Sequence, residues 1–229
     1  MATAAPRPLA VVFDVLETLM RLDPLAARFA DTGLPPAALH PWFLRLQRDC
    51  MALALTGETA GFRDAAREAL RVESGQTVRD ADVDHVLEGF PLLPAYDDAL
   101  PALRRLRQAG VAVGCLTVGE AEVTRAFLER NGLAPNVTRV VTAGEAGAWK
   151  PASRLYHAAA HRMGTPPART AVVAVHAWDC HGATRAGLVS GWCARLEGRH
   201  SSLFAQPDVT GEDLTQVAEG LLALPAPAP

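Results

Sequence analysis

Short, continuous apolar runs alternate with segments of helical spacing along most of this chain. A continuous apolar run predicts a strand buried on both faces, as the strands of parallel sheets are. Five such runs lie at residues 9–13, 111–116, 137–141, 171–175 and 188–194. Helical spacing of apolar residues lies between them, at residues 95–109, 120–131, 151–163 and 179–186. This alternation predicts an α/β fold in which helices cover both faces of a parallel sheet.

The stretch from residue 21 to residue 93 interrupts the alternation. It contains no strand-like run, and its spacing predicts helices at about residues 24–31, 36–55, 60–72 and 80–89. A helical insert directly after the first strand lies above the carboxyl ends of the strands, where a lid would cover a site. We therefore expect a doubly wound core of residues 1–20 and 94–229 and a helical cap of residues 21–93.

Polar side chains stand just beyond four of the predicted strands. They are Asp14 and Thr18 after the first strand, Thr117 after the second, Lys150 after the third and Asp179 after the fourth. Because the carboxyl ends of parallel strands meet at one edge of the sheet, these side chains are expected to converge there. An ammonium keeps a neighbouring carboxylate ionised, and an ionised aspartate can act as a covalent nucleophile. Each residue alone could equally cap a helix or form a turn, but the whole set in this order favours a catalytic site.

Lys150 is the only lysine among the 22 basic residues. The abundance of Ala, Gly, Pro and Arg indicates a coding bias under which arginine stands wherever either basic residue serves. An ammonium is a compact point charge, whereas a guanidinium is a bulky planar fork. The single lysine is therefore either a chance survivor or a position that needs an ammonium, and its place at a strand end favours the second interpretation.

Charge and hydropathy exclude several classes of partner. A formal net charge of −3 provides no basic surface for nucleic acid or for an anionic membrane. No apolar run reaches the roughly 18 residues of a membrane span, and the first residues lack the apolar core of a signal peptide. We therefore expect a cytoplasmic protein whose four cysteines are free thiols. A zinc site is not expected, because no common ligand spacing fits His176, Cys180, His181 and Cys193.

The residues at the strand ends resemble the motifs of the haloacid dehalogenase superfamily. Residues 11–19 (VVFDVLETL) resemble its nucleophile loop, and residues 116–117 resemble its second motif. Residues 149–156 (WKPASRLY) resemble the third motif, and residues 176–183 (HAWDCHGA) resemble the fourth as it stands in type II, or L-2-haloacid, dehalogenases. The resemblance covers essentially the whole chain. It implies a Rossmann-like core with an inserted helical cap.

The resemblance also implies a reaction that passes through an aspartyl ester. Asp14 would attack the carbon that carries the leaving group, and a water positioned by Asp179 would then hydrolyse the ester. Lys150 would hold Asp14 ionised. The other implied contacts are hydrogen bonds from Thr18 and Thr117 to Asp14 or to the substrate carboxylate, an orienting contact from Tyr156 to Lys150, and apolar walls formed by Leu16 and Trp178.

Leu16 decides between two reactions of the superfamily. Its phosphatases carry a second aspartate two residues after the nucleophile, which protonates the leaving group. Leucine stands at that position here and cannot transfer a proton, whereas a halide leaves without one. Leu16 therefore favours displacement of a halide from carbon over hydrolysis of a phosphate ester.

Three positions near the strand ends depart from the dehalogenase pattern. Val118 stands where an asparagine that helps to hold the halide is expected, and Ala174 stands where a serine is expected. His176 replaces a second expected asparagine. An imidazole there either activates the hydrolytic water near neutral pH or serves as a helix cap or supporting group.

The cap departs from the pattern as well. Phe43 occupies the expected place of a substrate-binding arginine. Arg45 or Arg48 could take over that role, but each helical residue turns the direction by about 100°, so neither points where residue 43 points. The sites for the substrate carboxylate and for the halide therefore differ from the family pattern.

The sequence thus predicts hydrolytic dehalogenation of a short 2-haloacid, a small-molecule carboxylate, without a cofactor. One alternative is a phosphatase or phosphonatase in which Asp14, the Leu16 carbonyl and Asp179 bind Mg²⁺, a hard cation suited to oxygen ligands. Another alternative is a catalytically weak family member that acts as a binding protein. The resemblance also suggests a homodimer.

Overall fold

Six strands form one parallel sheet in the computed structural model, which describes residues 5–226. Their order is β3-β2-β1-β4-β5-β6, so β1 lies inside the sheet and the strand order reverses beside it. Crevices for ligands form beyond the carboxyl ends of the strands at such a reversal. The strands are β1 (Ala10–Phe13), β2 (Ala112–Thr117), β3 (Arg139–Thr142), β4 (Thr170–Ala174), β5 (Val189–Cys193) and β6 (Val209–Gly211).

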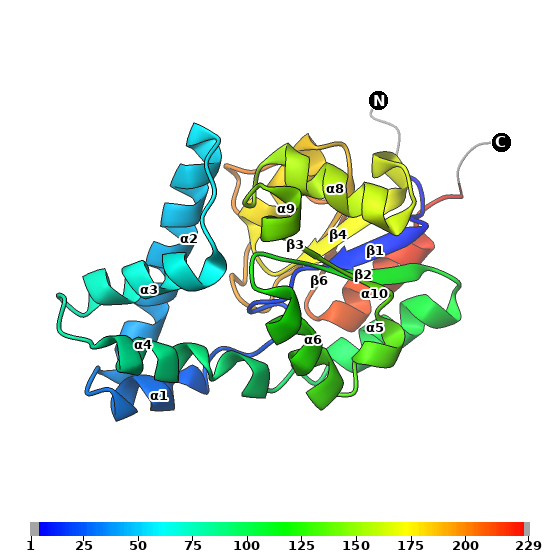
Figure 1. Ribbon diagram of the computed structural model, residues 1–229. Coiled ribbons are helices and arrows are strands. Elements are labelled where there is room, and N and C mark those ends of the chain that lie inside the picture. Colours follow the sequence, from blue (N-terminus) through cyan, green and yellow to red (C-terminus); the bar gives the residue numbers. More distant parts are fainter. Residues whose placement is uncertain (1–4, 227–229) are drawn as a thin grey trace.

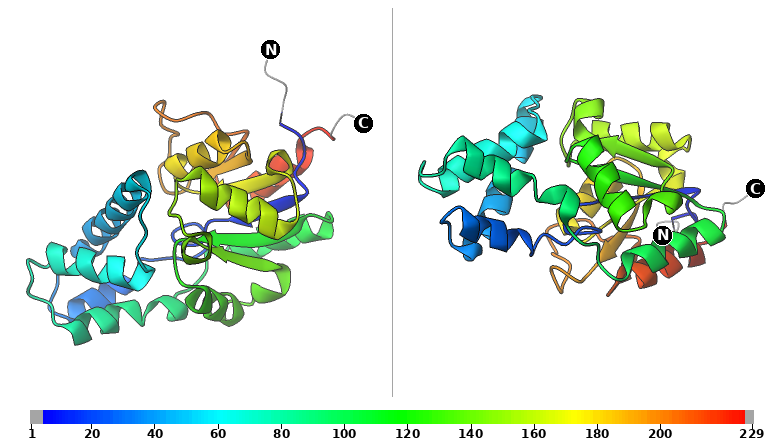
Figure 2. Two further views of the ribbon diagram at one scale, coloured as in Figure 1. Left: turned by 45° about the horizontal axis from the view of Figure 1, so that its top comes forward. Right: turned by 60° about the horizontal axis from the view of Figure 1, so that its bottom comes forward.

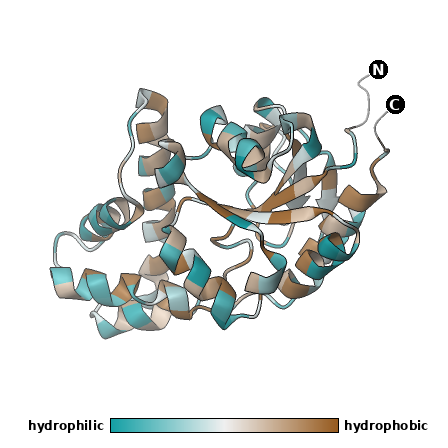
Figure 3. Ribbon diagram, turned by 45° about the vertical axis from the view of Figure 1, so that its right-hand side comes forward, coloured by the Kyte–Doolittle hydropathy of each residue, from teal (hydrophilic) through white to brown (hydrophobic). Residues whose placement is uncertain are grey.

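Helices cover both faces of this sheet (Figures 1 and 2). Helices α5, α6 and α10 lie on one face, and α8 and α9 lie on the other. Hydrophobic residues run along the strands, and the helices carry both hydrophobic and hydrophilic positions (Figure 3), so each helix buries one side against the sheet. Their bounds are α5 (Ala99–Gln108), α6 (Ala121–Arg130), α7 (Ala143–Ala146), α8 (Ser153–Met163), α9 (Ala177–Arg185) and α10 (Leu214–Ala223).

A helical cap stands beside the core, joined to it by two chain segments (Figure 1). Its own centre is Trp42, whose ring packs against Phe29 and Phe90 and whose indole nitrogen donates a hydrogen bond of 2.9 Å to the Ala66 carbonyl. This packing buries the Trp42 side chain completely. The cap helices are α1 (Leu25–Asp31), α2 (Leu39–Thr56), α3 (Phe62–Glu73) and α4 (Asp80–Leu87).

The predicted α/β fold with a parallel, doubly wound sheet is confirmed. All five expected strands are present within a few residues of their expected bounds. The sequence analysis did not predict β6, which has only three residues, or α10, which follows it. The exact domain boundaries at residues 21 and 93 stay predictions. Among residues 5–226, no helix is both long enough and apolar enough to cross a membrane.

Gly114 permits close packing in the middle of β2. A Cβ atom at this position would lie 2.8 Å from Sδ of Met163 in α8 and 3.1 Å from the Arg139 carbonyl oxygen in β3. The neighbouring strand and helix therefore leave no room for a methyl group. This packing supports the strand that ends at Thr117, beside the site described below.

We expect Gly114→Ala to lower the free energy of unfolding by about 1–3 kcal/mol, because overpacking forces the neighbours to move. Urea denaturation measures this change. Gly144→Ala is the matched control, since its Cβ would meet only one atom within 4 Å, the Thr142 hydroxyl oxygen at 3.9 Å. Equal stability of the two variants would contradict this account of β2.

Candidate active site

Asp14 begins the loop that follows β1 and is fixed there by its neighbours. Its backbone N–H donates to the Val173 carbonyl at 2.9 Å, which continues the pairing between β1 and β4. Its carboxylate oxygen Oδ2 accepts a hydrogen bond of 2.6 Å from the Thr18 hydroxyl. Thr18 in turn accepts one of 3.1 Å from the Val175 backbone N–H. The loop therefore holds the carboxylate in one orientation at the carboxyl end of the sheet.

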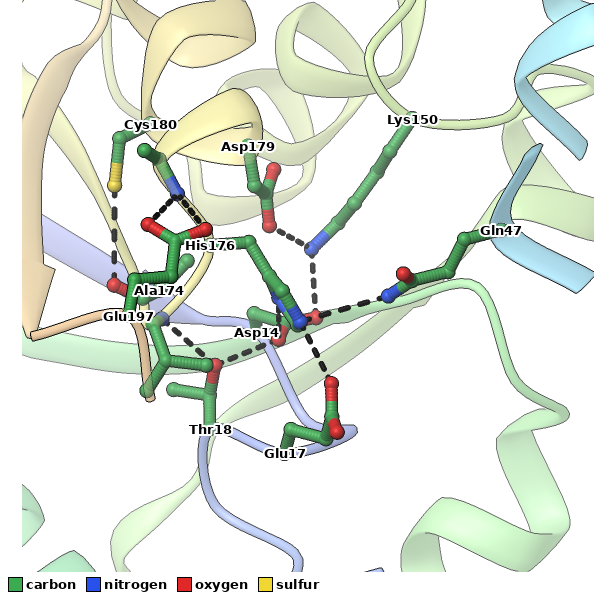
Figure 4. A network of polar contacts seen from close by, with 12 residues as sticks. Asp14, Glu17, Thr18, Gln47, Lys150, Ala174, His176, Asp179, Cys180 and Glu197 are labelled. Atoms are coloured by element: carbon green, nitrogen blue, oxygen red, sulfur yellow. Dashed lines mark hydrogen bonds and ion pairs between the residues drawn. The ribbon is translucent and has the colours of Figure 1, made fainter. Parts of the chain in front are cut away.

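Lys150 lies between two carboxylates (Figure 4). Its Nζ donates to Oδ1 of Asp14 at 2.9 Å and to Oδ2 of Asp179 at 2.5 Å. The three side chains come from the loop after β1, the segment before α8 and the first turn of α9. All three are buried, and the Lys150 side chain is only 1% exposed. The structure therefore brings together the ammonium and both carboxylates that the strand-end pattern singled out.

The charges of this cluster determine which of the two carboxyl groups ionises more readily. Burial alone raises the pKa of Asp14, but Lys150 and His176 outweigh burial and hold that pKa well below its usual range. Burial also raises the pKa of Asp179, and Lys150 offsets this only in part. Burial lowers the pKa of Lys150, yet Asp14 and Asp179 more than compensate and raise it. Asp14 therefore faces the site as an ionised carboxylate beside a protonated amine.

Tyr156 holds Asp179 rather than Lys150. Its hydroxyl donates to Oδ1 of Asp179 at 2.6 Å and lies 3.2 Å from the Asp179 backbone oxygen. The structure records no hydrogen bond between Tyr156 and Lys150, because the ring reaches α9 instead. Gly182 in α9 allows this approach, since a Cβ there would lie 2.5 Å from the tyrosine hydroxyl oxygen. Tyr156 thus orients the ammonium only through the carboxylate that they share.

A small cavity of about 30 Å³ opens beside Asp14 and Lys150. The core contributes the apolar side chains of Leu16, Val118, Trp149 and Trp178 to its wall, together with His176. The cap contributes one face of α2, whose residues on this wall are Phe43, Leu46, Gln47, Cys50 and Met51. The sequence analysis singled out only Phe43 from that face. The other four residues follow Phe43 by three, four, seven and eight positions, a spacing that puts them on the same face of a helix and that could have identified them.

Arg45 and Thr117, two residues of the expected site, make contacts other than those expected. Arg45 is not among the residues that line the cavity, and its Nε donates to Glu73 of α3 at 2.5 Å. Two helical residues turn the side-chain direction by about 200°, so Arg45 points away from the α2 face that carries Phe43. The Thr117 hydroxyl oxygen accepts a hydrogen bond of 3.0 Å from the Gly119 N–H, within its own loop. The structure records no contact between that hydroxyl and Asp14.

His176 lies beside Asp14 at the edge of the cavity (Figure 4). Its Nδ1 is 3.7 Å from Oδ2 of Asp14, and its Nε2 is 2.8 Å from Oε2 of Glu17. Burial lowers the pKa of His176, but the contacts with Asp14 and Glu17 raise it to about 9. Sequence reasoning missed Glu17, because its partner lies 159 positions away in the chain.

The phosphatase alternative needs Asp14 and Asp179 as magnesium ligands, and in this structure an ammonium lies between them. Nζ of Lys150 contacts Oδ1 of Asp14 and Oδ2 of Asp179. The remaining oxygens of the two carboxylates accept hydrogen bonds from Thr18 and Tyr156. Within residues 5–226, no group of three or more His, Cys, Asp or Glu side chains is arranged to hold a metal ion. The positive charge between these carboxylates is therefore that of Lys150.

Comparison with known proteins places the chain in a family. A sequence model of haloacid dehalogenase-like hydrolases matches residues 8–187. The chain belongs to the haloacid dehalogenase-like hydrolases. Membership of this family explains why the motifs of the sequence resemble those of the superfamily, and the protein is a hydrolase of this type.

Individual relatives of this haloacid dehalogenase-like hydrolase have different names. An (S)-2-haloacid dehalogenase of Pseudomonas fluorescens is 27% identical over 216 residues, which cover 92% of this chain and 95% of the relative. A phosphoserine phosphatase of Thermus thermophilus is 31% identical over 86% of this chain and 72% of its own length. The L-2-haloacid dehalogenase of Xanthobacter autotrophicus, with chloropropionic acid covalently bound, has a similar fold. Its TM-score is 0.85 at 21% identity, over 94% of this chain and 99% of that one.

We expect Tyr156→Phe to lower the free energy of unfolding by about 1.5–3 kcal/mol, because a buried carboxylate loses a hydrogen bond. Chemical denaturation measures the loss. Tyr96, the only other tyrosine, provides the matched control. Its hydroxyl has no hydrogen bond to the described residues, so Tyr96→Phe should change stability by no more than about 0.5 kcal/mol. Equal effects of the two substitutions would contradict the role of Tyr156 as a support for Asp179.

Proposed function

We propose that this hydrolase removes halide from short 2-haloacids through an ester on Asp14. The observation that carries the proposal is Leu16, which is buried and forms part of the cavity wall beside Asp14. It stands where a phosphatase of the superfamily would carry its acid, so this position offers the leaving group no proton. A halide needs none. The name of the Pseudomonas relative supports the same reaction.

The first step is a displacement at carbon. An oxygen of the ionised Asp14 carboxylate attacks C2 of the substrate, the carbon–halogen bond breaks, and the halide leaves with the bonding electrons. Lys150 keeps the carboxylate ionised through its contact with Oδ1, and Thr18 orients it through Oδ2. The apolar wall strengthens these contacts because it excludes water from the charges.

The second step frees the enzyme. Water attacks the carboxyl carbon of Asp14, the ester bond breaks, and the product is a 2-hydroxy acid. Lys150 then stabilises the negative charge that develops on the oxygen of Asp14. Asp179 holds that ammonium in place from its other side.

The cavity restricts the substrate to small acids. Its volume of about 30 Å³ leaves no room for a large substrate, and its apolar walls of Leu16, Phe43 and Trp178 suit a short carbon chain with a halogen. A phosphate dianion would have to give up its hydration in this apolar surrounding. A cytoplasmic location and a homodimer stay predictions for this protein.

We expect the purified protein to release halide from a panel of small 2-haloacids without added metal, and Asp14→Asn to release none. Ion chromatography measures the halide. Release that depends on Asp14 would support the dehalogenase. No release by the wild type, together with phosphate release from esters in Mg²⁺, would favour the phosphatase alternative. Inactivity in both assays would favour the binding protein.

We expect Lys150→Arg to lower the turnover number by at least about 100-fold, the size of effect seen when one charge-stabilising donor is lost. The positive charge remains, but the planar fork is too large for a side chain that is only 1% exposed between two carboxylates. Arg104→Lys, on the exposed side of α5, tests whether exchange of the two basic residues matters by itself. Wild-type turnover in Lys150→Arg would contradict the role of Lys150.

A further inference from the structure

The two nitrogens of His176 have different surroundings. Nε2 contacts Oε2 of Glu17 at 2.8 Å and lies 3.5 Å from the amide nitrogen of Gln47 in the cap. Nδ1 has no hydrogen-bond partner among the described residues and lies 3.7 Å from Oδ2 of Asp14. The residue is 6% exposed and lines the cavity. A buried nitrogen without a partner therefore lies beside the proposed nucleophile.

We propose that Glu17 and His176 form a carboxylate–imidazole pair that hydrolyses the Asp14 ester, in which Nδ1 of His176 takes a proton from the attacking water. The inference rests on the dehalogenation proposed above and concerns only its second step. His176 is a catalytic residue in this scheme. Glu17 is a positioning residue that fixes the ring through Nε2.

No other ionisable group of the cavity wall is available for this proton. Asp14 is consumed as the ester, and Lys150 is already protonated. Burial raises the pKa of the Cys50 thiol to about 12, so this thiol is protonated near neutral pH and cannot accept the proton. Asp179 is fully buried, does not line the cavity, and its two oxygens accept hydrogen bonds from Lys150 and Tyr156.

The backbone at Glu17 indicates a functional constraint. Its φ is 64°, in the left-handed region that side chains other than glycine seldom adopt. The turn is held by a hydrogen bond of 3.0 Å from the Glu17 N–H to the Met20 carbonyl. It brings the carboxylate to His176 (Figure 4). Strained residues of this kind gather at functional sites, where the surrounding structure holds them in place.

The charge of Asp14 controls when His176 can act. Before the reaction, the contacts with Asp14 and Glu17 raise the pKa of His176 to about 9 although burial opposes them, so the ring is an imidazolium. Ester formation removes the charge of Asp14, which lowers the pKa of His176 and releases a proton as the halide departs. The ring then becomes a base only after the ester exists. The groups around it are Asp14, Glu17 and Gln47, with Lys150 on the other oxygen of Asp14 and Glu197 on the Ala177 N–H.

The protons of the second step balance. The water oxygen bonds to the carboxyl carbon of Asp14 while one proton moves to Nδ1 of His176. The intermediate then collapses, the bond to the substrate oxygen breaks, and Nδ1 returns the proton to that oxygen to give the 2-hydroxy acid. The second proton of the water remains on the Asp14 carboxyl and is lost to solvent, because Lys150 favours the ionised form.

The first test separates the two steps in His176→Gln, which removes the imidazole without introducing the asparagine of the family pattern. We expect this variant to release about one halide per chain and then to hydrolyse the ester about 10²–10⁴-fold more slowly than the wild type, as the loss of a general base predicts. Mass spectrometry of the Asp14 peptide should show the attached carboxyalkyl group. His181→Gln is the control, because this histidine lies in α9, the helix that His176 precedes, and its Nδ1 accepts from the Ala205 N–H at 3.0 Å, outside the cavity wall.

The second test follows the pH dependence of ester hydrolysis in Glu17→Gln. Hydrolysis needs neutral His176, so its rate should rise with pH through the pKa of that ring. Because Glu17 raises this pKa, the midpoint should move to lower pH in Glu17→Gln. Glu219→Gln, on the exposed side of α10, should leave the midpoint unchanged. A merely structural role of Glu17 would not shift a midpoint.

Each outcome bears on the proposal. Accumulated ester in His176→Gln supports it, and wild-type turnover without ester overturns it while dehalogenation stands. If His176→Gln releases no halide at all, the midpoint in Glu17→Gln decides: a shift to lower pH supports the pair, and an unchanged midpoint overturns it. If the wild type releases no halide from any 2-haloacid, the dehalogenation fails and this inference fails with it.

Discussion

The site depends on one buried ammonium shared by two carboxylates. Burying an unpaired charge costs several kcal/mol, and the carboxylates of Asp14 and Asp179 offset that cost for Lys150. Each of the three side chains comes from a different part of the core, and the ion pairs therefore fix the relative positions of those parts. The same pairing gives the proposed nucleophile its charge. Nζ of Lys150 thus both holds these parts of the core together and keeps the proposed nucleophile ionised.

The sequence predicted the parts of the structure that follow from periodicity and topology. Apolar runs identified strands, and the parallel order put Asp14, Lys150 and Asp179 at one edge of the sheet, where the structure has them. Direction along a helix was equally predictable, and it explains why Arg45 turns away while Gln47 reaches the cavity. The short strand β6 gave too few residues for a pattern.

Other features could not be predicted, because they depend on contacts between distant segments. Tyr156 could have reached Lys150 or Asp179, and only the packing of α8 against α9 decides for the carboxylate. Glu17 meets His176 only because a left-handed turn redirects its side chain. The family alone does not decide the reaction either. Relatives named dehalogenase and phosphatase both match this chain in sequence. Because the fold does not determine the reaction, the side chains of the site have to decide between the two.

The division of the cavity between core and cap has a consequence for how the enzyme can change. The charges of the proposed reaction belong to the core, whereas one face of a single cap helix carries Phe43, Leu46, Gln47, Cys50 and Met51. Substitutions on that face can reshape the room for a substrate while the ion pairs below remain intact. New substrate preferences are therefore accessible to this scaffold through a handful of exchanges on one helix, without rebuilding the machinery that breaks the bond.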